Sequence, residues 1–152
     1  MCASLGKVQH EDSSIKNPLE IFSFEELDAV LGSLIEHSPP DAPWMAHITR
    51  ANGDTVSVGL GRPLILRSDG EPSSTEPRPD ITVFSWVQAD GKPPYYWSRG
   101  ARPASGRFVF FIDGHWTEFF PQSAIDIPTA RRTLQEFITG SGLPKTIGWE
   151  VI

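Results

Sequence analysis

Residues 44–60 read WMAHITRANGDTVSVGL, and this stretch decides the fold class. Apolar and polar side chains follow a period of two across 44–50 and again across 55–60, which is typical of strands with one buried face. Asn52-Gly53 lies between the two runs and favours a tight turn, because both residues tolerate positive φ angles. The stretch therefore predicts an antiparallel β-hairpin.

A second hairpin is predicted nearer the C-terminus. Asp113-Gly114 separates two runs rich in aromatic residues, 107–112 and 115–120, which are expected to pair as antiparallel strands. The other predicted strands are 81–87, 95–98 and 147–152, and 63–67 is expected to continue the first hairpin as a third strand.

Two helices are predicted from caps and apolar periodicity. Ser23 is an N-cap with Glu26 three residues later, which is a capping box, and Phe22 can pack on Leu27 as a hydrophobic staple. Pro39-Pro40 is expected to end this helix. Its apolar stripe is Phe24, Leu27, Val30, Leu31, Leu34 and Ile35. The second helix is expected to begin near Pro128 and to end at Gly140, with Ala130, Leu134, Phe137 and Ile138 as its stripe.

These elements run in the order helix, five or six strands, helix, strand. Strands joined by hairpins favour an α+β fold, in which a mostly antiparallel sheet of five to seven strands has two helices packed on one face. Residues 1–18 are polar and without period, so we expect an N-terminal arm outside the core, and a single α+β domain over 19–152. The proline-rich 68–80 and the Gly/Arg/Pro-rich 99–106 are expected to be loops.

Composition and charge narrow the function classes. Apolar residues make up 39% of the 152 residues, no run reaches the length of a membrane span, and the one cysteine, Cys2, cannot form an internal disulfide, so a cytoplasmic protein is expected. Residues 1–54 hold nine acids against three bases and account for the formal charge of −6. This acidity disfavours nucleic-acid binding and permits a basic protein partner, although an acidic surface that serves solubility alone is equally compatible.

The sequence offers no clear catalytic or metal site. His115 and Glu118 are three residues apart on a predicted strand, so their side chains point to opposite faces and cannot share a metal. His47 has no carboxylate near it in the sequence. Gly59-Leu60-Gly61 is too short for a phosphate loop and fits a bulge or close packing instead. We therefore expect no enzyme, no cofactor and no metal, and a hydrolase that uses His47 or His115 is the least favoured alternative.

Aromatic residues are abundant, with five Trp, nine Phe and two Tyr, mostly in the middle and at the end of the chain. The predicted strand 107–112 is apolar on both faces, and two helices can cover only one face of the sheet. Core packing explains any single aromatic, but as a group they suit a partner surface because Trp and Tyr dominate interface hot spots. The residues predicted to contact a partner are Glu36, Asp41, Tyr95, Tyr96, Trp97, Trp116 and Glu118.

The last third of the chain carries a recognisable pattern. A proline-started helix (Ile127-Pro128-Thr129-Ala130-Arg131-Arg132) is followed by Glu136-Phe137-Ile138-Thr139-Gly140, then Leu143-Pro144, and finally Trp149-Glu150. This pattern resembles the C-terminal signature of the first-numbered immunity-protein family of bacterial polymorphic toxin systems, and Thr55 to Gly61 is similar to the middle of that family. Its structural signature residues would be Phe137, Gly140, Pro144 and Trp149.

The resemblance implies an α+β protein that binds and neutralises a cognate toxin by stoichiometric occlusion of its active or substrate-binding site. The toxins most often linked with the family are nucleic-acid deaminases, whose zinc site needs one histidine and two cysteines. With a single cysteine, this chain cannot be the deaminase itself. The alternative is a small-ligand-binding α+β module without catalysis. A binder should expose a broad aromatic patch, whereas a ligand module should have a closed pocket.

Overall fold

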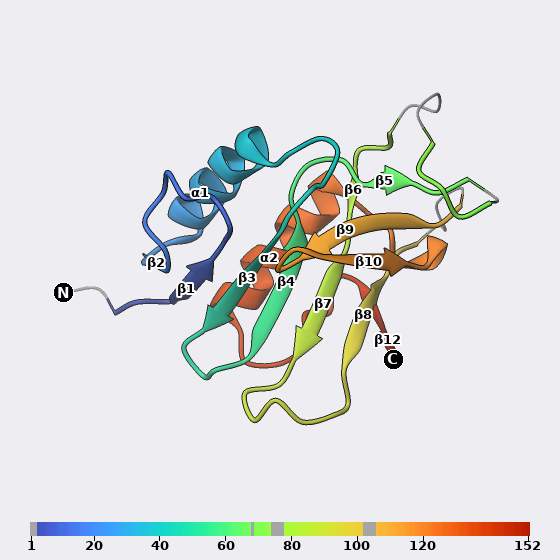
Figure 1. The fold of residues 1–152 in the computed structure, drawn as a ribbon. Helices are drawn as coiled ribbons and strands as arrows, with labels where there is room; N and C mark the ends of the chain where they lie inside the picture. The colour runs from blue at the N-terminus through green and yellow to red at the C-terminus, as the bar shows by residue number, and fades with distance from the viewer. Residues whose placement is uncertain (1–2, 68, 74–77, 102–105) are drawn as a thin grey trace.

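The structure is a computed structural model that describes residues 3–67, 69–73, 78–101 and 106–152 (Figure 1). The main sheet has the strand order β12-β8-β7-β4-β3-β1-β2, and each neighbouring pair is antiparallel. Its strands are β1 (Gly6–Gln9), β2 (Leu19–Ile21), β3 (Met45–Arg50), β4 (Thr55–Gly59), β7 (Phe84–Val87), β8 (Tyr96–Arg99) and β12 (Gly148–Val151).

Two smaller sheets accompany the main one. The first has the order β10-β9-β5, with β5 (Leu64–Ile65), β9 (Phe108–Ile112) and β10 (His115–Phe119), and the second pairs β6 (Ile81–Thr82) with β11 (Ile125–Asp126). The helices are α1 (Phe24–His37) and α2 (Ile127–Thr139), and a short 3₁₀ turn (Pro121–Ser123) precedes β11. The predicted α+β fold with a mainly antiparallel sheet is confirmed.

The molecule has three layers, with the main sheet in the middle. Both helices pack on one face, where Leu27, Leu34, Leu134 and Phe137 share a core with Ile48 and other strand residues. On the opposite face the three-stranded sheet packs through Phe108, Phe110 and Phe119 against Met45 and Val83. Each fully buried Leu, Ile or Phe side chain in these two cores contributes about 2 kcal/mol by removal from water.

Helix α1 begins as predicted. The Oγ of Ser23 accepts a hydrogen bond from the N–H of Glu26 (3.1 Å), and the Glu26 carboxylate accepts one from the N–H of Phe22 (2.7 Å). The return bond of the capping box thus reaches the residue before the N-cap. Helix α2 has Asp126 as its N-cap, one residue before the helix, and ends at Gly140, whose φ of −104° is not left-handed.

Both predicted hairpins are present. The first joins β3 to β4 with Gly53 at a φ of 96°. In the second, Asp113 (φ 50°) and Gly114 (φ 81°) form the two-residue connection between β9 and β10, which is a type I′ turn. Gly59, near the end of the first hairpin, has no room for a side chain because the Phe110 ring fills that place. Close packing is thus the role of this glycine.

The prediction that residues 1–18 form a polar arm outside the core is wrong for residues 6–9. Gly6–Gln9 form β1, which pairs with both β2 and β3, and Val8 is completely buried. The strand is short and alternates buried with exposed residues, so only one large apolar side chain, Val8, marks it in the sequence. Such a weak pattern is outweighed locally by the polar residues around it.

Two of the predicted strands pair differently from expectation. Of 63–67, only Leu64–Ile65 form a strand, and it pairs with β9 of the second sheet instead of extending the first hairpin. The predicted strand 81–87 is divided at Val83 into β6 and β7, which belong to different sheets. Parts of the predicted loops, residues 68, 74–77 and 102–105, lie outside the described residues.

Candidate partner-binding site

The main-sheet face opposite the helices is only partly covered by the hairpin β9–β10. His47, Ser57, Ser85 and Trp97 stand in register across β3, β4, β7 and β8, and one row further towards the turns lie Thr49, Thr55 and Val87. We call these seven residues the polar shelf. The β9–β10 hairpin crosses the same four strands next to the polar shelf. Two contacts fix its position: the N–H of Phe111 donates to the carbonyl of Pro43 (2.8 Å), just before β3, and the Asp113 carboxylate reaches His47.

His47 lies at the border between hairpin and shelf. Its Nδ1 is 2.6 Å from Ser57 Oγ, and its Nε2 is 2.9 Å from Asp113 Oδ1. No carboxylate is near His47 in the sequence, and the turn brings Asp113 to it across 66 positions.

A serine, a histidine and an aspartate in this order are also found in nucleophilic catalysis. Here, however, Ser57 is 7% exposed and lies in a strand paired on both sides, so its backbone N–H groups are engaged in the sheet. An acyl-transfer site needs an accessible nucleophile and free N–H groups for the oxyanion. The chain of hydrogen bonds instead fastens the tip of the hairpin to the main sheet.

Trp116 and Glu118 lie together on the hairpin. The Trp116 and Phe111 rings pack edge to face with their centroids 5.8 Å apart. The Nε1 of Trp116 donates to Glu118 Oε1 (3.1 Å), and Trp116 is 42% exposed. The Glu118 carboxylate also forms an ion pair with Arg107. Two of the predicted partner-binding residues thus form one exposed cluster.

The three consecutive aromatics 95–97 are separated. Tyr96 packs on the helix side of the sheet, whereas Trp97 points to the hairpin side and contacts Phe119 (4.6 Å) and Phe120 (5.3 Å). This agrees with the alternation expected of a strand. Tyr95 is the exposed one, and its hydroxyl donates to the carbonyl of Gly91 (2.9 Å).

Glu36 and Asp41 are exposed at and beyond the end of α1. The loop that carries Asp41 reaches the hairpin two residues later, where Pro43 accepts the hydrogen bond from Phe111. Asp41 thus belongs to a segment beside the Trp116 cluster, whereas Tyr95 lies next to the end of β12, where Ile152 donates to its carbonyl (2.9 Å). The seven predicted partner-binding residues are therefore spread over several parts of the molecule.

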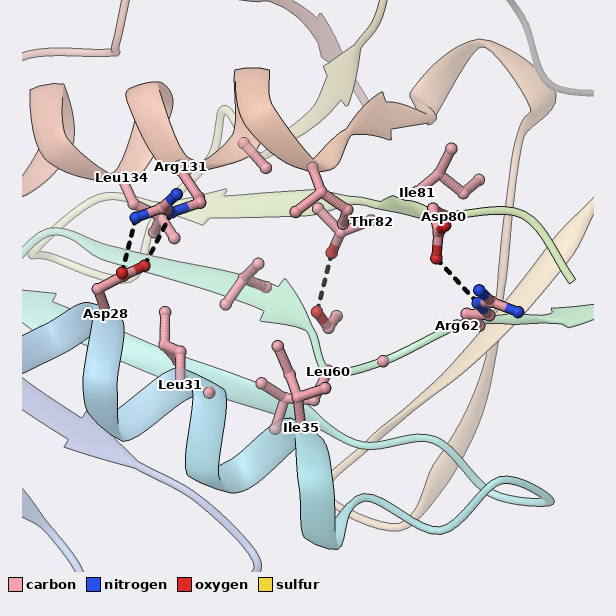
Figure 2. A pocket seen from close by; sticks show the side chains of 16 residues that line it. Asp28, Leu31, Ile35, Leu60, Arg62, Asp80, Ile81, Thr82, Arg131 and Leu134 are labelled. Carbon is pink, nitrogen blue, oxygen red and sulfur yellow. Dashed lines mark hydrogen bonds and ion pairs between the residues drawn. The ribbon is translucent and has the colours of Figure 1, made fainter.

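An apolar groove of about 430 Å³ lies between the two helices and the ends of β4 and β6 (Figure 2). An ion pair stands at each end: Asp28 with Arg131 (2.7 Å) joins α1 to α2, and Arg62 pairs with Asp80 (2.8 Å). Its apolar lining includes Leu31, Ile35, Leu60, Ile81, Ile127 and Leu134. The groove can hold an apolar side chain or a small apolar ligand, and sequence reasoning missed it because its walls come from distant segments.

The signature residues surround one aromatic cluster on the helix side. Phe137 is 1% exposed and meets Trp86 edge-on at 5.6 Å. Trp149 lies 6.1 Å from Trp86, and its Nε1 donates to the carbonyl of the buried Pro144 (2.9 Å). Gly140 caps α2.

Arg50 completes this cluster and was missed by sequence reasoning. Its guanidinium lies over the rings of Trp86 (4.9 Å) and Phe137 (4.6 Å) and donates to the carbonyl of Phe137 (3.0 Å) and to Asp54 (2.8 Å). An arginine at the end of a strand, two residues before a turn, looks like an exposed residue in the sequence. Its only signal is the acid four positions later.

Glu136 anchors the segment between α2 and β12. Its carboxylate accepts hydrogen bonds from the N–H of Lys145 (2.6 Å) and from the N–H (3.0 Å) and hydroxyl (2.5 Å) of Thr146. Partial burial raises the pKa of this carboxyl, but the hydrogen bonds from Thr146 and Lys145 outweigh it and leave the pKa below its ordinary value.

Two further findings concern ligands and membranes. Among the described residues, no group of three or more His, Cys, Asp or Glu side chains could hold a metal ion. In the same part of the chain, neither helix is long and apolar enough to cross a bilayer.

Comparison with known proteins adds one finding. Residues 15–151 match the family model described as immunity protein Imm1. No curated protein matches the chain.

Proposed function

The chain belongs to the Imm1 family of immunity proteins, and from this premise we propose that it neutralises a cognate bacterial toxin by binding it one to one. The match over residues 15–151 is the observation that carries the proposal. Binding alone blocks the toxin, so the immunity protein needs no catalytic residue of its own. We place the complex in the cytoplasm, where a toxin would meet its target.

For the toxin we propose a nucleic-acid deaminase whose substrate-binding or active site is occluded. An enzyme that grips nucleic acid presents basic side chains to the phosphates. The first third of the immunity protein is acidic, and Glu25, Glu26 and Glu36 of α1 are exposed. These carboxylates can compete for the basic groove and speed the encounter with it. The acidic surface therefore supports a toxin with a basic substrate-binding groove.

The groove between α1 and α2 favours a second candidate function, the binding of a small apolar ligand. Its apolar lining and its volume of about 430 Å³ are suitable for such a ligand. Both ends carry exposed ion pairs, and the groove is open in place of the closed pocket expected of a ligand module (Figure 2). We therefore rank it below toxin binding.

Titration of the toxin distinguishes the two functions. The product of the neighbouring upstream gene is purified, and its deaminase activity on single-stranded and double-stranded DNA and on RNA is measured against increasing immunity protein. We expect activity to fall linearly and to reach zero at one equivalent. If the toxin kept its activity at excess immunity protein, and native mass spectrometry showed a small molecule bound to the immunity protein, the ligand-binding function would replace the first.

A further inference from the structure

Strand β10 is an edge of the three-stranded sheet, and within the described part of the chain its outer backbone groups have no hydrogen-bond partner. The two-residue turn at Asp113-Gly114 makes Ile112 and His115 a hydrogen-bonded pair, so the next such pair is Phe110 with Thr117. The N–H and C=O groups of Trp116 and Glu118 therefore point away from β9. No hydrogen bond from the described residues reaches these four groups.

The space beside this edge has a floor. Phe111, whose N–H points away from β10, bonds to Pro43 before β3, so β10 lies on the side of His47 and Thr49. Strands β3, β4, β7 and β8 continue past β10 towards their turns (Figure 1). His47 and Trp97 of the polar shelf contact the hairpin, and the next row, Thr49, Thr55 and Val87, lies beyond them. Since stacked sheets lie about 10 Å apart, the edge of β10 stands one sheet layer above the shelf, and the two form a step.

We propose that β10 receives an extended strand of the cognate toxin, which adds to the three-stranded sheet as a fourth strand and lies over the polar shelf. The inference rests on the proposed function and identifies the surface that performs it. Alternating backbone donors and acceptors at Trp116 and Glu118 select a polypeptide strand over a compact ligand. The side chains of Trp116 and Glu118 contact one face of that strand, and Thr49, Thr55 and Val87 contact the other.

The charges near the edge fit a basic strand. Asp113 is exposed at the tip of the hairpin, where it contacts His47. Glu118 lies along the hairpin and pairs with Arg107. Basic side chains of an incoming strand would find carboxylates at both places. This agrees with a toxin that binds nucleic acid.

The same step excludes a second copy of this chain as the occupant. Pairing of two β10 edges about a two-fold axis would place the two main sheets in one layer. Because each main sheet extends beyond its own β10 edge, the Thr49 and Thr55 ends of the two copies would collide. A single strand that is not backed by a sheet of its own fits the step.

A pair of substitutions at one residue tests the backbone contact. In Glu118→Pro the outward N–H is removed while the hydrogen bonds to β9 remain, because residue 118 does not donate to β9. Glu118→Ala loses the same carboxylate but keeps the N–H. We expect Glu118→Pro to bind the toxin at least about tenfold more weakly than Glu118→Ala, with equal melting temperatures for the two free variants.

Amide hydrogen exchange on the wild-type protein gives a second readout that does not depend on folding of the proline variant. The N–H groups of Trp116 and Glu118 should exchange fast in the free protein and slowly in the complex, whereas that of Thr117, bonded to β9, should be slow in both. Tight binding with no protection at Trp116 and Glu118, or equal affinities of the two variants, would overturn the strand proposal and leave the proposed function intact. Protection of these groups in the free protein, together with a dimeric mass, would assign the edge to a second copy. Failure of the wild type to bind the toxin would remove both proposals.

Discussion

Arg50 carries a buried positive charge on the helix side of the sheet. Its side chain is 2% exposed, and its partners are the Asp54 carboxylate, the side-chain amide oxygen of Asn52, the backbone carbonyl of Phe137 and two aromatic rings. The planar guanidinium can serve all of them at once, because it stacks on the rings while its N–H groups donate in the plane. The position therefore specifies arginine and not merely a cation.

Substitution of Arg50 should lower the free energy of unfolding, and by more when the replacement loses more of the arginine's contacts. Arg50→Lys keeps the charge but loses the stacking and one hydrogen bond, so we expect a loss of about 2 kcal/mol of unfolding free energy. Arg50→Ala also leaves Asp54 without its cation and should cost about 3–5 kcal/mol. Urea unfolding measures both, with Arg67→Ala as the control, since the Arg67–Asp69 pair is exposed and should contribute less than about 1 kcal/mol. Equal stability of Arg50→Lys and wild type would show that the geometry of the guanidinium is unimportant.

Trp149 should stabilise the fold rather than bind the partner. It packs between Phe84 (6.3 Å) and Trp86 (6.1 Å), so Trp149→Ala is expected to cost about 3 kcal/mol and to lower the melting temperature. Trp149→Phe retains a ring but loses the hydrogen bond to Pro144 and should cost about 1 kcal/mol. Thermal melts and toxin binding are measured on the same samples. A Trp149→Ala protein that melted like wild type yet failed to bind would identify an interface residue.

At the scale of elements, the sequence predicts what local chemistry determines. Turn pairs such as Asn52-Gly53 and Asp113-Gly114 locate both hairpins, and the Ser23 cap locates α1, because each signal acts within a few residues. The pairing partner of a short strand is a non-local property. Leu64–Ile65 reads as a strand, but nothing near it indicates β9.

The candidate site was predictable to a similar extent. The exposure of Trp116 and its neighbour Glu118 follows from strand alternation on a hairpin, whereas Tyr96 could not be assigned to a face without knowing which side the helices cover. The bond between His47 and Asp113, the burial of Arg50 and the groove between α1 and α2 all join segments far apart in the sequence. No local pattern contains them.

Glu136 should make the attachment of β12 to α2 sensitive to acid. Because its folded pKa lies below the ordinary value of 4.5, the carboxylate stabilises the fold fully above that pH, and this contribution is lost as the pH falls through the lower folded pKa. Glu136→Gln removes the titrating group, so its stability should fall less between pH 6 and pH 4 than that of wild type. Urea unfolding at the two pH values gives the comparison. Parallel pH profiles of the two proteins would mean that the hydrogen bonds to Lys145 and Thr146 are not coupled to folding.

At the scale of the whole molecule, charge and structure are distributed differently. Residues 1–54 carry nine acids and three bases, and they form β1, β2, α1 and β3, whereas the proposed docking strand β10 comes from the neutral remainder. The two parts are joined by the pairing of β3 with β4, and the loop after α1 also reaches β9. The exposed acids of α1 lie on the helix side of the main sheet, away from the docking edge, but an electrostatic field acts over distance and can steer a basic toxin before short-range contacts form. The two surfaces should therefore affect different rate constants.

Charge reversal at Glu36 and Asp41 tests this division. Glu25 and Glu26 lie in the first turn of α1, where they also stabilise the helix dipole, but Glu36 near the helix end has no such structural role. The double variant Glu36→Lys/Asp41→Lys should therefore fold normally and associate with the toxin about tenfold more slowly at low salt, with little change in dissociation and a weaker dependence on ionic strength. Glu71→Lys, an exposed acid outside the acidic third, is the matched control and should associate at nearly the wild-type rate. Stopped-flow measurements of the association rate constant at two salt concentrations test this prediction. An association rate that responds neither to the charge reversals nor to salt would mean that electrostatic steering has no part in recognition.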